Sequence, residues 1–99
     1  MFLEHAVLDV VPGQSAAFEA AFATARPLIE RQPGFVSLRF ERCVERASRY
    51  LLLVEWIRLE DHTEGFRGSP DYQAWRELLH HFYDPFPTVE HYVPVVGSS

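Results

Sequence analysis

Hydrophobic residues recur along the chain first with the period of a strand and then with the period of a helix. Residues 2–11 alternate at every second position, which predicts a strand with two faces: Ala6, Leu8 and Val10 on one, Leu3, His5 and Val7 on the other. From Ser15, the expected N-cap, to about residue 32 the apolar residues share one helical face: Phe18, Phe22, Ala25 and Ile29. Pro27 predicts a kink or an early end of the helix because it removes a backbone donor. Pro33-Gly34 predicts its termination, with Gly34 as a left-handed cap.

Two further strands are predicted over residues 35–44 and 50–58, joined by a hairpin at residues 45–48. Residues 51–57 contain one charge and no turn-forming residue. A strand with one face in water alternates apolar and polar residues, so we expect this strand to be buried on both faces. The sequence leaves open which of its two sets of residues faces the helices: Tyr50, Leu52, Val54 and Trp56, or Leu51, Leu53, Glu55 and Ile57.

Two residues are exceptions within these apolar strands. Glu55 is the one carboxylate in its strand, and a buried carboxylate must be neutral or paired. Arg39 or Arg42 on the neighbouring strand is the expected partner. Cys43 is the single cysteine, so no disulfide can form within the chain, and its place in an apolar strand predicts an inert, buried thiol.

The second half of the chain predicts one more helix and one more strand. Residues 59–62 are typical of a short helical turn. Ser69-Pro70-Asp71 is a strong helix start, with a capping hydroxyl, a proline at the first helical position and an acid in the first turn. This helix should run to about Phe82, with one apolar face: Tyr72, Trp75, Leu79 and Phe82. Residues 84–87 stop it, and residues 88–96 predict the last strand.

The order of elements is βαββαβ, which is the ferredoxin-like arrangement of the α+β class. It predicts an antiparallel sheet with the first and third strands at its centre and both helices on one face. The chain of 99 residues is a single domain over residues 1–96, followed by a tail at residues 97–99. Because no helix remains to cover the other face of the sheet, we expect a homodimer through that sheet face.

The charge and hydrophobic content of the chain limit the kinds of molecule that it is expected to bind. The formal net charge is −5, and all nine cationic residues are Arg, so binding to nucleic acid or to an anionic membrane is not expected. No segment reaches the roughly 18 apolar residues of a membrane span, and the N-terminus lacks a secretory signal. These features predict a cytoplasmic protein. The hydrophobic content of 47% is high for this length, and the surplus has to fill a core, line a pocket or form an interface.

Several short segments resemble a known family. They are Leu53-Val54-Glu55-Trp56, Asp61-His62, Phe66, Ser69-Pro70, Tyr72 and Pro87-Thr88-Val89-Glu90-His91-Tyr92. Together they resemble the antibiotic biosynthesis monooxygenase domain family. The resemblance implies a dimeric α+β barrel. It also implies an oxidation of aromatic substrates by molecular oxygen that needs no cofactor, neither flavin nor metal.

Related members of that superfamily degrade haem with an Asn, a Trp and a His, and this chain departs from their pattern. It contains no Asn. Phe66 stands where the Trp would fall, and Arg76 is nearest by spacing to the position of the His. Haem degradation is therefore disfavoured.

Cofactor-free oxygenation needs an apolar slot, a base, a group that stabilises the substrate anion, and exclusion of water. We place the slot between the sheet and the helices, and we expect it to bind a small aromatic or hydrophobic ligand. The expected substrate-binding residues are Phe22, Phe66, Trp75, Leu79, Phe82 and Tyr83. The expected catalytic residues are His62 as base, with Tyr72 and Arg76 as stabilisers of the oxyanion. His62 could instead fix a turn, Arg76 could lie on the surface, and the aromatic residues could simply fill a core.

The remaining histidines complete the candidate chemistry. His81 should be solvated and His80 should lie at the margin of its helix face, while the orientations of His5 and His91 stay open. No His-x₃-His pair or carboxylate triad occurs, so no metal site is expected.

Three functions remain open from the sequence. The first is a cofactor-independent monooxygenase acting on a quinol-like substrate. The second is a non-enzymatic dimeric module that binds a hydrophobic small molecule. The third is an interaction scaffold with a solid core.

Overall fold

The computed structural model describes residues 1–97, so residues 98–99 of the predicted tail lie outside the described part of the chain. The elements follow the predicted order, with short helical turns η1 and η2 on either side of α2. Their bounds are β1 (Phe2–Asp9), α1 (Ser15–Glu30), β2 (Phe35–Arg42), β3 (Arg49–Trp56), η1 (Asp61–Phe66), α2 (Pro70–Leu79), η2 (His80–Phe82) and β4 (Val89–Tyr92).

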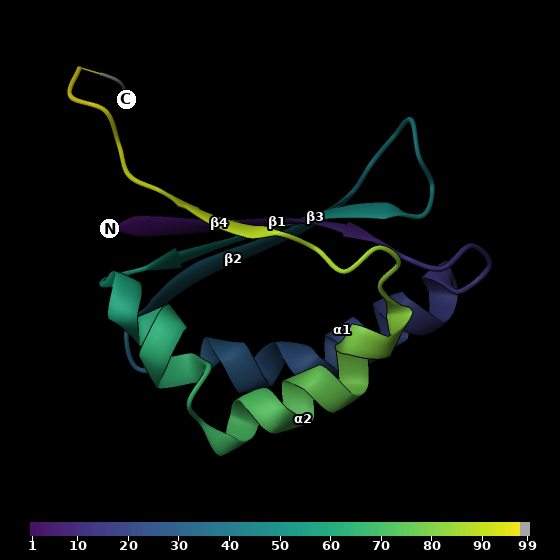
Figure 1. Ribbon diagram of the computed structural model, residues 1–99, viewed down its shortest axis with the longest axis horizontal. Helices are drawn as coiled ribbons and strands as arrows, with labels where there is room; N and C mark the ends of the chain where they lie inside the picture. The colour runs from purple at the N-terminus through teal and green to yellow at the C-terminus, as the bar shows by residue number, and fades with distance from the viewer. Residues whose placement is uncertain (98–99) are drawn as a thin grey trace.

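The four strands form one antiparallel sheet in the order β2-β3-β1-β4. The prediction that the first and third strands are central is confirmed. Ala6 of β1 lies opposite Leu52 of β3 on one side and Val89 of β4 on the other. Figure 1 shows both helices beneath one face of the sheet, and no helix of residues 1–97 lies over the other face. The α+β, ferredoxin-like fold is therefore confirmed, and the sheet of one protomer is open rather than closed into a barrel.

The orientation of β3, which the sequence left open, is now fixed. Four of its residues are buried against the helices: Tyr50, Leu52, Val54 and Trp56. The alternate residues point to the outer face, where they are only half-buried: Leu51, Leu53 and Glu55. The protomer therefore buries one face of this apolar strand and leaves the other partly open.

Glu55 does not pair with an arginine, so that prediction is wrong. Ser37 lies opposite Glu55 in the β2–β3 register, and its hydroxyl donates a hydrogen bond to the Glu55 carboxylate over 3.0 Å. Arg39 donates instead to Glu41, and Arg42 pairs with Glu19 at 3.6 Å. A half-exposed carboxylate needs no cation, because water and one hydroxyl satisfy it.

Helix α1 differs from its prediction at both ends. Gln14 rather than Ser15 precedes the first turn, and the Ser15 hydroxyl donates to the Ala47 carbonyl at 3.4 Å instead of capping the helix. The helix continues through Pro27 and ends three residues later, at Glu30. Burial of Ile29 in the core holds this last turn in place despite the missing donor.

The predicted start of α2 is confirmed, but the predicted cap of α1 is wrong. Helix α1 ends at Glu30 with Arg31 as its C-cap, so Gly34 lies in the turn before β2 and does not cap the helix. Gly34 has a φ of +84°, and a side chain on it would meet the carboxylate of Asp61. The Ser69 hydroxyl accepts a hydrogen bond from the Tyr72 backbone N–H at 3.2 Å, so Ser69 caps α2 as expected. Helix α2 itself stops at Leu79, and η2 takes the chain on to Phe82.

All four strands end earlier than predicted, and β2 and β4 show the consequences. Strand β2 ends at Arg42, which leaves Cys43 half-exposed in the hairpin, where its thiol lies 3.6 Å from the Glu45 carboxylate. The expectation of a buried thiol is therefore wrong. Strand β4 covers only Val89–Tyr92, because its pairing with β1 ends there.

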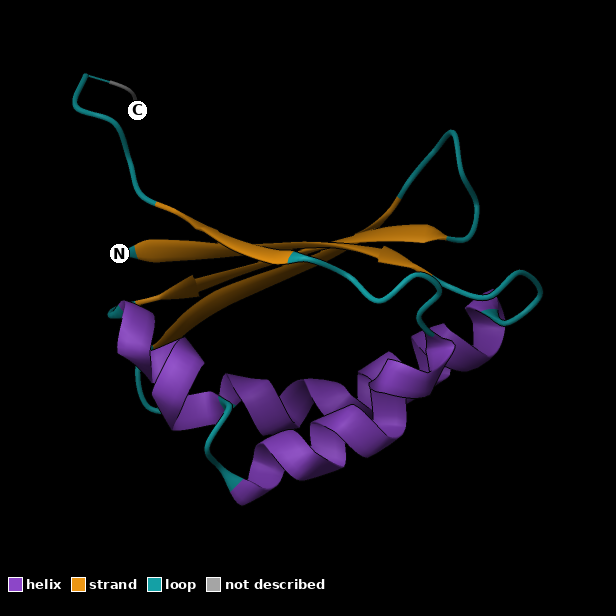
Figure 2. Cartoon of the chain, in the orientation of Figure 1, coloured by secondary structure: helices purple, strands orange, loops and turns teal. Residues whose placement is uncertain are grey.

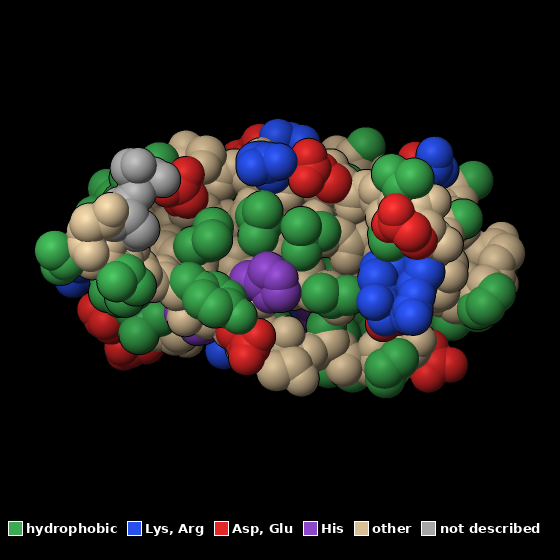
Figure 3. All heavy atoms as spheres, turned by 90° about the horizontal axis from the view of Figure 1, so that it is seen from above, with side chains coloured by type: hydrophobic (Ala, Val, Ile, Leu, Met, Phe, Trp, Pro, Cys, Tyr) green, Lys and Arg blue, Asp and Glu red, His purple; other side chains and the backbone are tan. Residues whose placement is uncertain are grey.

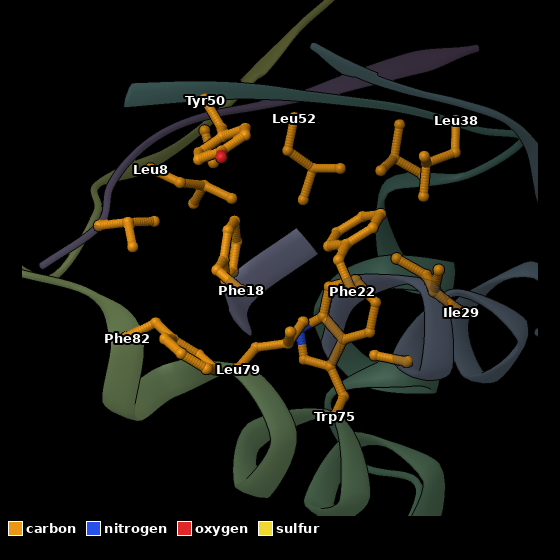
Figure 4. Packing of buried hydrophobic residues seen from close by; sticks show 14 of the residues in the cluster. Leu8, Phe18, Phe22, Ile29, Leu38, Tyr50, Leu52, Trp75, Leu79 and Phe82 are labelled. Carbon is orange, nitrogen blue, oxygen red and sulfur yellow. The ribbon is translucent and has the colours of Figure 1, made fainter. Parts of the chain in front are cut away.

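Aromatic rings dominate the core between the sheet and the helices (Figure 4). The Phe18 ring of α1 lies 5.1 Å from Tyr50 and 5.5 Å from Phe82. Phe22 stacks on Phe40 with ring centroids 3.8 Å apart. These contacts join residues of α1, β2, β3 and η2 in one layer. Figure 2 shows the two helices lying on the same side of the sheet. Within residues 1–97 no helix is long and apolar enough to cross a membrane.

Candidate active site

A cavity of about 400 Å³ lies between the inner face of the sheet and the segment that runs from η1 to β4. Strand β1 supplies its floor, and α2, η2 and the chain before β4 supply its walls. Fourteen residues line it: Glu4, Ala6, Leu8, Leu52, His62, Phe66, Arg67, Tyr72, Trp75, His80, Tyr83, Phe86, Pro87 and Val89. The lining is rich in aromatic residues and includes one carboxylate and one guanidinium group.

Glu4 is the centre of a polar network at one end of this cavity. Its side-chain atom Oε1 accepts a hydrogen bond from the indole Nε1 of Trp56 over 3.0 Å. The same oxygen lies 3.3 Å from Nε2 of His62, and Nδ1 of His62 lies 2.8 Å from Nε2 of His91. Glu4 is 5% exposed and His62 is 3% exposed. Four elements thus bring one connected set of polar atoms into an apolar interior.

Burial controls the charge of this network. Burial raises the pKa of Glu4 to about 7, although the hydrogen bond from Trp56 and the nearby Arg67 both act to lower it. Burial also lowers the pKa of His62 to about 3, with Arg67 and His91 adding to the effect. Both shifts favour the uncharged forms of the two side chains.

Other polar groups surround the same space. Burial raises the pKa of the Tyr83 hydroxyl above its ordinary range, so this phenol stays protonated and can donate a hydrogen bond. Burial, with Arg76 nearby, lowers the pKa of His80, whose ring lies 6.0 Å from Tyr72 and 5.0 Å from Phe86. Within residues 1–97 no group of three or more His, Cys, Asp or Glu side chains is arranged to hold a metal ion.

Comparison with known proteins places this fold and cavity in one family. The family model described as antibiotic biosynthesis monooxygenase matches residues 1–78. This chain belongs to the antibiotic biosynthesis monooxygenase family.

Individual relatives support the same assignment. The chain is 52% identical over 95 residues to the uncharacterized protein YczJ of Bacillus subtilis (strain 168), covering 96% of this chain and 100% of YczJ. It is 38% identical to an antibiotic biosynthesis monooxygenase-type protein from Bordetella bronchiseptica, with a TM-score of 0.89 over 96% of this chain and 97% of that one. SnoaB from Streptomyces nogalater, described as a cofactor-independent oxygenase, shares the fold at 21% identity and a TM-score of 0.73, over 99% of this chain and 95% of SnoaB.

In this member of the antibiotic biosynthesis monooxygenase family, the structure brings together five of the residues that the sequence nominated. They are His62, Phe66, Tyr72, Trp75 and Tyr83. An open cavity beside Trp75 argues against a scaffold with a solid core.

Four nominated residues lie elsewhere. Phe22, Leu79 and Phe82 are buried in the aromatic core and are absent from the cavity lining, because they fill the layer between α1 and the sheet. Arg76 is exposed on α2 and takes no part in the lining. Arg67, which follows η1, supplies the guanidinium group of the cavity instead.

Sequence reasoning missed Glu4 and Arg67 and left His91 undecided. Glu4 is in phase with Ala6, Leu8 and Val10 on the face of β1 that the alternation marked as apolar. A charged residue on a buried face is a usable signal of function. The position of Arg67 depends on the π-helical turn η1, which no periodicity in the sequence indicates. His81 is exposed, as expected, and His80 is half-buried.

Proposed function

We propose that this protein is a cofactor-independent monooxygenase that acts on small hydroxylated aromatic compounds of the quinol or anthrone type. The observation that carries the proposal is the buried Glu4–His62 pair beside Arg67 in an aromatic cavity. Membership of the antibiotic biosynthesis monooxygenase family supports it, as does the shared fold with SnoaB, which is described as a cofactor-independent oxygenase.

The proposed reaction begins with removal of a proton from the bound aromatic compound. The resulting anion is electron-rich, and it reduces oxygen directly. For an anthrone-type substrate, a ring CH₂ group and O₂ become a ring C=O group and water, so one oxygen atom enters the product and the substrate supplies all the electrons. The protein has to remove the proton, stabilise the anion and keep bulk water out.

Residues of the cavity match these three tasks. The Glu4–His62 pair removes the proton. Arg67 and Tyr72 both line the cavity, so we assign to them the stabilisation of the anion that the sequence assigned to Arg76 and Tyr72. Phe66 and Trp75, with ring centroids 5.5 Å apart, form an apolar wall.

Oxygen uptake with a panel of hydroquinones and anthrones tests this proposal. We expect uptake by the wild type, and a loss of about 10²-fold in His62→Ala, with a smaller loss in Tyr72→Phe. His81→Ala is the matched control, because His81 is exposed outside the cavity. If the two cavity variants consume oxygen as fast as the wild type, the assignment of roles is wrong. Binding of the aromatic compounds without any uptake would support the non-enzymatic binding module instead.

We also propose that two copies associate through the outer face of the sheet, and the general dimerism of the family supports this. Figure 3 looks onto that face and shows hydrophobic side chains gathered over its middle. A groove of about 520 Å³ crosses it, lined in part by Leu3, Leu53 and Tyr92. Nδ1 of His5 is buried in this face, and it is the one buried side-chain nitrogen or oxygen within residues 1–97 that lacks a hydrogen-bond partner. A second copy would cover the apolar groove and supply that partner.

A further inference from the structure

We propose that the Glu4 carboxylate is the atom group that takes the proton from the cavity, and that His62 and His91 then carry this proton to solvent. The inference deepens the proposed function and rests on it only for the identity of the substrate. Its basis is the connected path of atoms from β1 through η1 to β4.

The path has an inner and an outer end. Glu4 and His62 are buried, whereas His91 lies half-buried on β4, the edge strand of the sheet. The gaps along the path are 3.3 Å from Glu4 Oε1 to His62 Nε2 and 2.8 Å from His62 Nδ1 to His91 Nε2. An imidazole can accept a proton at one ring nitrogen and release another from its second nitrogen. The two rings therefore connect a carboxyl in the cavity with the edge of the sheet.

Glu4 suits the role of acceptor better than His62 does. Both ring nitrogens of His62 face other members of the network, so neither is left for a substrate proton. The contacts of Glu4 with Trp56 and His62 are both made by Oε1. A carboxylate has about four lone-pair sites, so Oε2 remains for a proton from the cavity.

The charged and titratable groups around Glu4 fit the same assignment. Arg67 faces it from the segment after η1, His62 from η1, His91 from β4 and Tyr83 from the chain after η2. Of these, only Arg67 carries a full charge at neutrality. Burial places the pKa of Glu4 near 7, so an ionised fraction is present at neutral pH. The lowered pKa of His62 means that its ring passes a proton on rather than retaining it.

The proposed transfer balances. An O–H or C–H bond of the substrate breaks, an O–H bond of Glu4 forms, and the negative charge moves from the carboxylate to the substrate anion beside Arg67. Rotation of the Glu4 carboxyl about its Cγ–Cδ bond exchanges its two oxygens and brings the new O–H to Nε2 of His62, the atom that Oε1 contacts in the structure. Glu4 then gives this proton to Nε2 while His62 releases the proton on Nδ1 to His91. His91 loses a proton to water, so one proton leaves per substrate ionised.

The first test follows the ionisation of Glu4 without ligand or oxygen. The chain has two tryptophans, so the indole N–H region of an ¹H–¹⁵N NMR spectrum holds two signals. We expect the Trp56 signal to move with pH with a midpoint near 7, because its Nε1 donates to Glu4. In Glu4→Gln this movement should disappear, while the Trp75 signal serves as the internal reference. A Trp56 signal that titrates unchanged in Glu4→Gln overturns the assignment of Glu4.

The second test separates the acceptor from the relay. Under anaerobic conditions, 2-naphthol is mixed with the protein in weak buffer at neutral pH, and the naphtholate absorption and the release of protons to an indicator dye are recorded together. In the wild type we expect both signals to rise together. Glu4→Gln should form naphtholate about 10²-fold more slowly. In His91→Gln, proton release should lag behind naphtholate formation about tenfold, whereas in the control His81→Gln the two signals should rise together as in the wild type.

Two results of this second test would each contradict one part of the proposal. Naphtholate formation at the wild-type rate in Glu4→Gln overturns Glu4 as the acceptor. Proton release that keeps pace with naphtholate formation in His91→Gln overturns the relay. Because neither measurement involves oxygen, a failure of the proposed oxygenation leaves both readouts intact, and the two claims can fail separately.

Discussion

At the scale of single residues, burial of the Glu4 carboxyl has a cost in stability and a proposed benefit in proton transfer. A buried carboxylate loses its hydration, and one hydrogen bond from Trp56 together with a nearby guanidinium does not restore it. Its pKa of about 7 is close to the working pH that an acid–base catalyst needs. The same burial that makes Glu4 useful therefore makes its ionised form costly for the fold.

Replacement of Glu4 by Gln should stabilise the protein in a pH-dependent way. Because the pKa of Glu4 in the folded state lies above the ordinary value of 4.5, its contribution to stability is complete below pH 4.5 and is lost between pH 4.5 and about 7. The free energy of unfolding of Glu4→Gln relative to the wild type should thus rise across this window, by about 3 kcal/mol, and stay level above it.

Urea denaturation from acid to alkaline pH measures this difference. His62 acts in the opposite direction, since its lowered pKa removes stability as the pH falls from 6.5 towards 3. That contribution is common to both proteins, so the difference between them reports mainly on Glu4. A difference that does not change with pH contradicts the raised pKa.

The individual residues of the candidate site were only partly predictable. His62 could be nominated from a predicted helical turn and Tyr72 from a predicted helix face. The sequence nominated Arg76, but Arg67 lines the cavity instead. Its position follows from the π-helical turn η1, whose geometry residue spacing does not reveal. The side of the sheet that His91 faces depends on its register with Glu4, which only the folded structure supplies.

At the scale of elements, helix and strand boundaries were predicted correctly where a local residue, such as a capping serine, determines them. Ser69 and Pro70 begin α2 where the sequence placed them, whereas Gly34 has its left-handed φ four residues beyond the end of α1 and does not cap that helix. The ends of β2, β4 and α2 depend instead on where pairing and packing partners run out, and those partners are distant in the sequence. The predicted elements were therefore correct in kind and order but too long.

Substitution of Gly34 tests the boundary between α1 and β2. Both Gly13 and Gly34 have a positive φ, at +87° and +84°, but a side chain at Gly13 meets nothing within 4 Å. Gly13→Ala should therefore lower the free energy of unfolding by only about 1 kcal/mol, the conformational cost of a side chain at positive φ. Gly34→Ala should lose at least about 1 kcal/mol more, because its side chain displaces Asp61, whose carboxylate accepts a hydrogen bond from the Arg58 backbone N–H at 3.0 Å.

Thermal or urea unfolding of the two glycine variants compares these costs directly. Equal losses of stability in both would show that the Asp61 carboxylate moves aside freely, and that the contact has no structural role.

For the whole molecule, the main feature is the outer face of the sheet, which is apolar but is not covered within one protomer. Strand β3 is apolar on both faces, and the helices cover only one of them. Beyond β3, Ile57 is 59% exposed, and Tyr92 of β4 is 46% exposed. The strand pattern alone was enough to predict this situation, because a continuous apolar run has no face suited to water.

Charge introduced on that face should prevent association. We expect the wild type to sediment as a dimer at micromolar concentration and Leu53→Arg to sediment as a monomer, because the substitution buries an unpaired guanidinium in the interface. Gln73→Arg, on the exposed surface of α2, adds the same charge away from the sheet and should remain dimeric. A wild-type protein that stays monomeric would contradict the proposed interface.

The central claim is that one buried carboxyl in the cavity converts an aromatic compound into an anion that reacts with oxygen. The rate of oxygen uptake by the wild type and Glu4→Gln with an anthrone, measured between about pH 5 and pH 9, tests it most directly. The wild-type rate should rise with pH through the pKa of Glu4, near 7, and then level off, because the base must be ionised to act. Above pH 7 Glu4→Gln should be slower by about 10²-fold or more, and the gap should narrow as the wild-type rate falls at lower pH. An equal rate in both proteins above pH 7, or a wild-type rate that falls as the pH rises through 7, would contradict the account.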